Sequence, residues 1–141
     1  MRILGLDIGK KRIGVAVSDE LGITAQGLMT IERGKNEDVI VTLLSLVEKY
    51  NIREIVIGLP RHMDGRLGEE GEDIVSLGKE IQERIGVPVV FWDERLSTVA
   101  AERALLEADV SRRRRKKVID KIAAAWILSG YLERRNKGSF L

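Results

Sequence analysis

The first 32 residues alternate short apolar runs with glycine-containing turns. Residues 2–8, 12–18 and 23–32 each have the pattern of an extended segment. The links between them are short enough to join antiparallel neighbours. We therefore predict a meander of three antiparallel strands at the start of the chain.

Helical and strand-like patterns alternate in the middle of the chain. Apolar residues recur at helical spacing over 36–50 and again over 68–85, where Gly86 is expected to end the helix. Residues 52–59 and 87–92 are short apolar runs, which are typical of buried strands. This order predicts two further strands, each reached through a helix.

Two helices are expected in the last third of the chain. Ser97 or Thr98 can cap a helix that runs to about residue 108. The basic run 112–117 leads into a second helix, which continues to 131–135. Together these elements predict an α/β fold with a mixed five-stranded sheet and helices on its faces.

The length of the chain predicts a single domain. A chain of 141 residues can bury one substantial core, so we expect one domain over 1–141, with 136–141 as a frayed tail. Residues 61–72, rich in glycine and acids, are expected to form a connection beyond a strand's carboxyl end, where functional loops often lie. An ordinary solvated loop is the alternative for that segment.

The composition restricts the chemistry that the chain can perform. Cysteine is absent and His62 is the sole histidine, which excludes thiolate and imidazole catalysis and any zinc site that needs several such ligands. No apolar run approaches the roughly 20 residues that span a bilayer, and the N-terminus enters a strand pattern without a signal-peptide stretch. We therefore expect a cytoplasmic protein without membrane association, in which carboxylates carry any catalysis.

The net charge of +2 is small, but the positive residues are clustered. Lys10, Lys11 and Arg12 are consecutive, and basic residues continue without interruption over 112–117. Each cluster could be a solvated surface, or it could contact the phosphates of a nucleic acid.

Asp7 ends the first apolar strand and is followed by a turn at Gly9. A carboxylate at the end of a buried strand is costly unless something compensates its charge. It could accept hydrogen bonds from the amides of the turn, or it could bind a metal ion.

Asp93 and Glu94 end the strand predicted over 87–92. Because side chains alternate across a strand, only one of the two can face the same side as Asp7. We favour Glu94 for that position, and expect Asp93 to pair with Arg95 or to help cap the following helix.

Asp120 lies on the inward face of the last helix. Apolar residues recur after it at helical spacing, which directs its side chain toward the core. A helix N-cap, or an ion pair with Lys116 or Lys117, is the alternative explanation. The apolar residues of this face are Ala123, Ala124, Ile127, Leu128 and Tyr131.

The three acids can converge in one fold. One ends the first strand, one ends a central strand, and one lies on the inward face of a helix. Converging carboxylates repel one another unless cations neutralise them. Hard ions such as Mg²⁺ or Mn²⁺ relieve that repulsion, and a pair held about 4 Å apart can activate water and stabilise the leaving oxygen of a phosphodiester. The pattern therefore predicts metal-dependent phosphodiester hydrolysis.

Several motifs together resemble one known family, the YqgF or RuvX-like proteins. The matching segments are Asp7-Ile8-Gly9, Lys11-Arg12-Ile13-Gly14-Val15-Ala16, Gly58-Leu59-Pro60, Asp93-Glu94-Arg95-Leu96-Ser97-Thr98, and Asp120 with Ala123-Ala124. The resemblance implies a ribonuclease H-like fold related to Holliday-junction resolvases. It also implies a nuclease that matures the 5′ end of precursor 16S ribosomal RNA during ribosome biogenesis.

The resemblance also implies roles for individual residues. It makes Asp7, Glu94 and Asp120 the catalytic acids and metal ligands, with Lys11, Arg12 and Arg95 as phosphate contacts. In the wider superfamily the strand equivalent to 52–59 often ends in an acid, but here it ends in Gly58-Leu59-Pro60. The choice between Asp93 and Glu94 and the number of metals therefore stay open.

The basic run suggests how a nucleic acid would be held. It directly precedes the helix that carries Asp120, and phosphate contacts supply most of the affinity for nucleic acid. Since aromatic residues are few, with Trp92 and Trp126 expected in the core, we predict recognition of backbone and shape. The residues of the run expected to bind nucleic acid are Arg112, Arg113, Arg114, Arg115 and Lys116.

Other functions fit parts of the same pattern. A Holliday-junction resolvase acting on four-way DNA is the closest alternative, and a dimer would be expected for it, whereas we expect a monomer or weak dimer. A non-catalytic RNA-binding ribosome-assembly factor is a second alternative. A sugar-kinase or actin-like ATPase shares an Asp-x-Gly after the first strand, but the chain lacks room for the second lobe.

Overall fold

The computed structural model describes residues 1–96 and 118–137 with their side chains, and the backbone of 112–117. The helix expected over 98–108 lies outside the described residues. No helix in the described part of the chain combines the length and apolar character needed to cross a membrane.

The strands form one mixed sheet, as the sequence predicts. Its order is β3-β2-β1-β4-β5. The first three strands pair antiparallel, and β1, β4 and β5 run parallel. Their bounds are β1 Arg2–Ile8, β2 Arg12–Ser18, β3 Ala25–Glu32, β4 Ile52–Leu59 and β5 Val89–Asp93.

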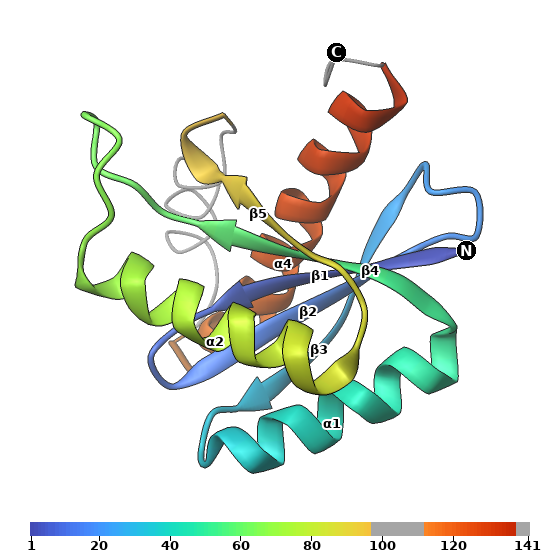
Figure 1. The fold of residues 1–141 in the computed structure, drawn as a ribbon, viewed down its shortest axis with the longest axis horizontal. Helices are drawn as coiled ribbons and strands as arrows, with labels where there is room; N and C mark the ends of the chain where they lie inside the picture. Colours follow the sequence, from blue (N-terminus) through green and yellow to red (C-terminus); the bar gives the residue numbers. More distant parts are fainter. Residues whose placement is uncertain (97–111, 138–141) are drawn as a thin grey trace.

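Helices cover both faces of the sheet. Helices α1 (Asn36–Tyr50) and α2 (Glu69–Ile85) lie on one face, and α4 (Arg112–Asn136) lies on the other (Figure 1). A single 3₁₀ turn, η1 (Glu94–Leu96), follows β5. The parallel strands β1, β4 and β5 thus share one edge at their carboxyl ends, near η1 and the loop before α2.

Alternation along β1 divides the core into two layers. Leu4, Leu6 and Ile8 belong to the cluster under α1 and α2, whereas Ile3 belongs to the cluster under α4. Asp7 shares its strand face with Ile3, because side chains two residues apart point the same way. The side chain of Asp7 is therefore on the α4 face.

Glycines allow α4 to lie unusually close to the sheet. A Cβ added to Gly5 would lie 2.8 Å from the Leu128 Cβ, and one added to Gly14 would lie 1.9 Å from the Asp120 carbonyl oxygen. Real side chains do not approach so closely, so these positions need glycine. The glycines bring the backbone of α4 at Asp120 directly onto β2.

The helix α4 is anchored by its apolar face and by polar contacts, among them one from Tyr131. The predicted inward residues Ala123, Ala124, Ile127, Leu128 and Tyr131 are all buried. The Tyr131 hydroxyl donates to Glu54 Oε1 of β4 at 2.7 Å, and burial followed by this bond raises the pKa of Tyr131 to about 12. Trp92 is buried and Trp126 packs against the same cluster, as predicted.

Some boundaries differ from those expected. Strand β3 begins at Ala25 because Asp19 accepts hydrogen bonds from the amides of Ile23 and Thr24, which holds these two residues in a turn. Helix α4 includes the basic run and continues through Asn136, which was expected in the tail. The Asn136 side chain donates to the Gly22 carbonyl at 2.9 Å, which fastens the end of the helix to the β2–β3 turn.

Candidate active site

Asp7 lies at the carboxyl end of β1, on the face that α4 covers. Its ladder partner on β2 is Gly14, above which the Asp120 backbone rests. The turn after Asp7 is closed by the Gly9 amide, which donates to the Arg12 carbonyl at 2.8 Å. The fold therefore brings Asp7 and the backbone of Asp120 to the same part of the sheet, although 113 positions separate them in the chain.

Asp120 is held by an ion pair with Arg12. Arg12 Nε donates to Asp120 Oδ2 at 2.8 Å, and both side chains are about one-fifth exposed (22% and 21%). The predicted N-cap role is wrong, because Asp120 lies well inside α4. The predicted ion pair with Lys116 or Lys117 falls on side chains outside the described part of the structure.

Asp93 and Glu94 diverge at the end of β5. Glu94 Oε1 lies 2.7 Å from the position that a Cβ on Gly58 would take, next to Ile127 of α4. Glu94 is thus on the α4 side, the side that Asp7 faces. Asp93 instead accepts hydrogen bonds from the Arg95 guanidinium at 2.7 and 3.1 Å, and this bonding lowers the pKa of Asp93.

Asp7 and Glu94 line one cavity of about 160 Å³. Glu70, from the first turn of α2, lines it as well, and it was not singled out from the sequence. Its sequence signal is its place within the segment 61–72, which is rich in glycine and acids. The remaining lining residues are Ile8, Pro60 and Ile74.

The donor chemistry of this cavity suits a hard divalent cation, because carboxylate oxygens are the ligands that Mg²⁺ and Mn²⁺ prefer. Within the described residues, however, no three acidic or histidine side chains are grouped closely enough to hold a metal ion. Asp7 and Glu94 line the cavity, whereas Asp120 is paired with Arg12.

The predicted phosphate contacts surround the same edge of the sheet. Lys11 is exposed in the turn after Asp7, Arg12 begins β2, and Arg95 is exposed in η1. The residues Arg112, Arg113, Arg114, Arg115 and Lys116 form the first turns of α4, and their side chains lie outside the described part of the structure.

Arg33 supports the turn that carries the first basic cluster. Its Nη1 donates to the Gly9 carbonyl at 2.9 Å and to Asp73 of α2 at 2.8 Å. The Arg33 side chain is 11% exposed, and its hydrogen bond lowers the pKa of Asp73. This link between the turn and α2 was not foreseen, because nothing in the spacing joins positions 33 and 73.

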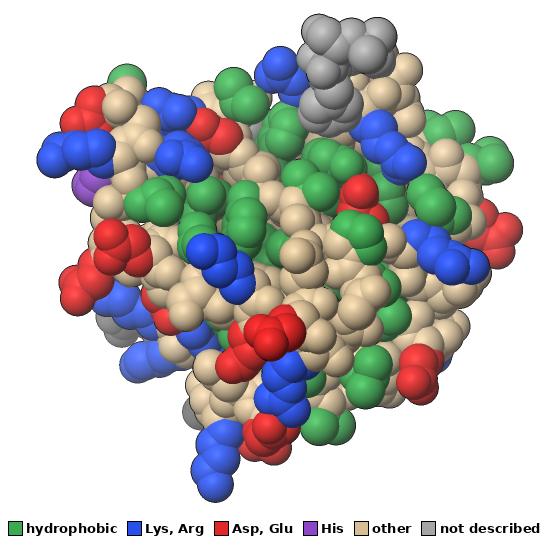
Figure 2. Space-filling model, in the orientation of Figure 1, with side chains coloured by type: hydrophobic (Ala, Val, Ile, Leu, Met, Phe, Trp, Pro, Cys, Tyr) green, Lys and Arg blue, Asp and Glu red, His purple; other side chains and the backbone are tan. Residues whose placement is uncertain are grey.

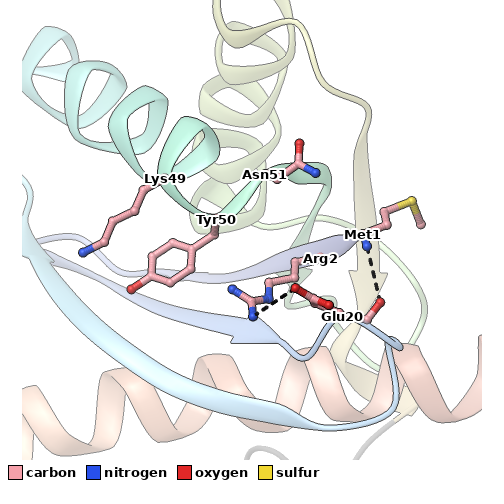
Figure 3. Close-up of a pocket in the computed structure, with 6 residues that line it drawn as sticks. All are labelled: Met1, Arg2, Glu20, Lys49, Tyr50 and Asn51. Carbon is pink, nitrogen blue, oxygen red and sulfur yellow. Dashed lines mark hydrogen bonds and ion pairs between the residues drawn. The ribbon is translucent and has the colours of Figure 1, made fainter.

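A separate cavity of about 170 Å³ lies at the opposite edge of the sheet. Figure 3 shows Arg2 directed at Glu20 across it, with Tyr50 and Lys49 from the end of α1 alongside. Arg2 and Asp7 are five residues apart on β1, which at strand rise is about 17 Å. This cavity is therefore remote from Asp7 and Glu94.

Comparison with known proteins identifies the family. Residues 1–134 match the family described as RuvX, Holliday junction resolvase. A protein of Clostridium botulinum strain Eklund 17B, named "Putative pre-16S rRNA nuclease", is 54% identical over 137 residues, which cover 97% of this chain and 100% of that protein. A protein of Moorella thermoacetica with the same name is 55% identical over 134 residues, covering 95% and 96%.

Solved structures with low sequence identity share the fold. RuvC of Thermus thermophilus in complex with a Holliday junction has a TM-score of 0.60 at 13% identity, covering 96% of each chain. The fowlpox virus Holliday junction resolvase has a TM-score of 0.53 at 16% identity, covering 94% of this chain and 99% of that one. The mixed sheet is thus ribonuclease H-like, and by sequence the chain belongs to the RuvX family of nucleases.

Proposed function

We propose that this nuclease is a metal-dependent endonuclease that matures the 5′ end of precursor 16S ribosomal RNA, acting in the cytoplasm. One observation carries the metal dependence: Asp7 of β1 and Glu94 of η1, which follows β5, line a single cavity at the carboxyl edge of the sheet. The substrate is inferred from the relatives, which are named for pre-16S rRNA.

The three acids have distinct parts in the proposal. Asp7 and Glu94 would hold the divalent ion, Mg²⁺ or Mn²⁺, and Asp120 would join them by leaving Arg12. A bound ion of this kind lowers the pKa of water and stabilises a leaving oxygen. Arg12, once separated from Asp120, would be available to a phosphate of the RNA together with Lys11.

The basic start of α4 would hold the RNA strand. The consecutive positive charges one to two turns before Asp120 come from Arg112, Arg113, Arg114, Arg115 and Lys116. Contacts of this kind bind phosphates irrespective of sequence and weaken as salt rises. Resolution of four-way DNA is a second candidate, favoured by the resolvase fold and by the description of the family.

Cleavage of a 5′ precursor 16S RNA fragment tests the proposal. Wild-type protein with Mg²⁺ or Mn²⁺ should cut the fragment, EDTA should stop it, and Asp7→Asn should abolish cleavage. Glu133→Gln, an exposed change near the far end of α4, is the matched control and should cut normally. Cleavage by Asp7→Asn at the wild-type rate would refute the assignment, and cleavage of four-way DNA alone would favour the second candidate.

A further inference from the structure

Asp93 lies between two arginines that come from different segments. Arg95 of η1 donates to it through its backbone amide at 2.9 Å and through its guanidinium at 2.7 Å. Arg61, in the loop between β4 and α2, places its Nε 3.8 Å from the same carboxylate. One negative charge thus faces two positive charges at the end of β5.

The same two arginines brace the loop between β4 and α2. Arg61 Nη1 donates to the Gly65 carbonyl at 2.8 Å, and Arg95 Nη1 donates to the Met63 carbonyl at 3.4 Å. The loop closes on itself through the His62 amide, which donates to the Arg66 carbonyl at 2.9 Å. In Figure 1 this loop projects beyond the sheet, and Figure 2 shows the single histidine there among charged side chains.

The braced loop borders a second hollow, which shares two lining residues with the candidate site. A cavity of about 320 Å³ is lined by Arg61 and His62 on one side and by Glu69 on the other. It shares Pro60 and Glu70 with the cavity of Asp7 and Glu94. A strand that entered the candidate site along this hollow would pass Arg61.

We propose that Asp93 is a positioning residue, which orients Arg61, at the hollow, and Arg95, against the loop beside it, toward the backbone phosphates of an RNA strand. A guanidinium carries five N–H donors, so one that bonds to a carboxylate retains donors for a phosphate. The two guanidinium-bearing side chains stay about one-third exposed, at 33% and 38%. The inference rests on the proposed function and adds Arg61 and Asp93 to its binding surface.

The substitution Asp93→Asn distinguishes positioning from bulk electrostatics, because the two predict opposite changes in the affinity for RNA. Removing a negative charge should tighten RNA binding if charge alone matters, whereas loss of orientation should weaken it. We expect about tenfold weaker binding for Asp93→Asn, a change of about 1.4 kcal/mol. The matched control is Asp64→Asn, which breaks the exposed pair with Arg66 in the same loop and should bind as tightly as wild type or slightly tighter.

Binding is measured by fluorescence anisotropy with a labelled 5′ precursor 16S RNA fragment in EDTA, from about 50 to 200 mM salt. Arg61→Ala and Arg95→Ala should each weaken RNA binding. Each should also reduce the slope of the logarithm of affinity against the logarithm of salt concentration by about one. Asp93→Glu, which restores a carboxylate, should recover most of the affinity. Unfolding curves of each variant establish that the protein is folded at the assay temperature.

Three results would overturn the inference: Asp93→Asn binding as tightly as wild type, Arg61→Ala without effect on affinity or slope, or Asp93→Glu failing to recover affinity. If Asp93→Asn proves unstable, the result for Arg61→Ala decides, since Arg61 is exposed. Failure of wild-type protein to bind the RNA at any salt would refute the proposed function itself. Cleavage at saturating RNA should persist in Asp93→Asn, because orientation affects KM more than kcat.

Discussion

The contact between Gly14 and α4 offers the sharpest test of how the third acid is placed. A Cβ on Gly14 would lie 1.9 Å from the Asp120 carbonyl oxygen and 2.3 Å from the carbonyl carbon. Both obstructing atoms belong to the helix backbone, so no side-chain rotation can relieve the clash. In Gly14→Ala the helix must therefore move away from β2 at Asp120.

The size of the movement follows from the contact. Restoring a 3.0 Å separation from 1.9 Å requires a shift of about 1 Å, and overpacking of this kind costs about 1–3 kcal/mol of stability. A catalytic group displaced by about 1 Å can lose about 10²-fold in rate. We therefore expect a protein that is less stable but still folded. Its cleavage rate should fall by much more than the loss of folded protein can explain.

Two measurements on the same preparation check this expectation. Chemical unfolding gives the loss of stability, and cleavage of the precursor RNA fragment at a temperature where the variant is folded gives the rate. Gly34→Ala is the matched control, because within the described residues no atom beyond its chain neighbours lies within 4 Å of its added Cβ. The reasoning would be refuted if Gly14→Ala were folded and cleaved RNA within about twofold of wild type.

Three further substitutions test other contacts. Gly58→Ala should displace the Glu94 carboxylate, whose Oε1 lies 2.7 Å from the added Cβ, and a cleavage rate equal to wild type would contradict this. Tyr131→Phe should cost about 1 kcal/mol at pH 7. The folded pKa of Tyr131 is raised to about 12, so the stabilisation from its neutral hydroxyl is present below about pH 10 and is lost as the pH rises toward 12. Between about pH 10 and 12 the free energy of unfolding should therefore fall less in the variant than in wild type. Arg33→Ala should lower the free energy of unfolding by about 1 kcal/mol. Because the pKa of Asp73 is lowered, its pairing with Arg33 is favourable above about pH 4, so the stability difference between variant and wild type in urea unfolding should shrink in acid. A stability difference that stayed constant with pH would argue against the pair.

Much of the fold follows from periodicity in the sequence. The sequence pattern predicted every described strand and α-helix, although not the 3₁₀ turn η1 or the start of α4 within the basic run, because burial on one or both faces leaves a repeat of two or 3.6 residues. Alternation also predicted that only one of Asp93 and Glu94 could share a face with Asp7. The other acid, Asp93, was predicted to pair with Arg95, and the structure confirms this pair. These are properties of single elements.

Pairings between distant elements could not be predicted in the same way. The helical repeat showed that Asp120 points inward but not that its partner is Arg12, 108 residues away. Such contacts depend on how α4 lies across the sheet, and that is set by glycines whose role is visible only in three dimensions. The place of Glu70 in the cavity could not be predicted either, since it depends on how α2 lies relative to the ends of β1 and β5.

The central claim is that Asp7 and Glu94 hold a divalent ion with Asp120 as a third ligand. Anomalous diffraction from crystals soaked in Mn²⁺ tests it most directly. The claim predicts an anomalous peak in the cavity lined by Asp7 and Glu94, with the Asp120 carboxylate turned from Arg12 toward the ion. A preparation that cleaves RNA with Mn²⁺ but whose crystals show no peak in this cavity would contradict it.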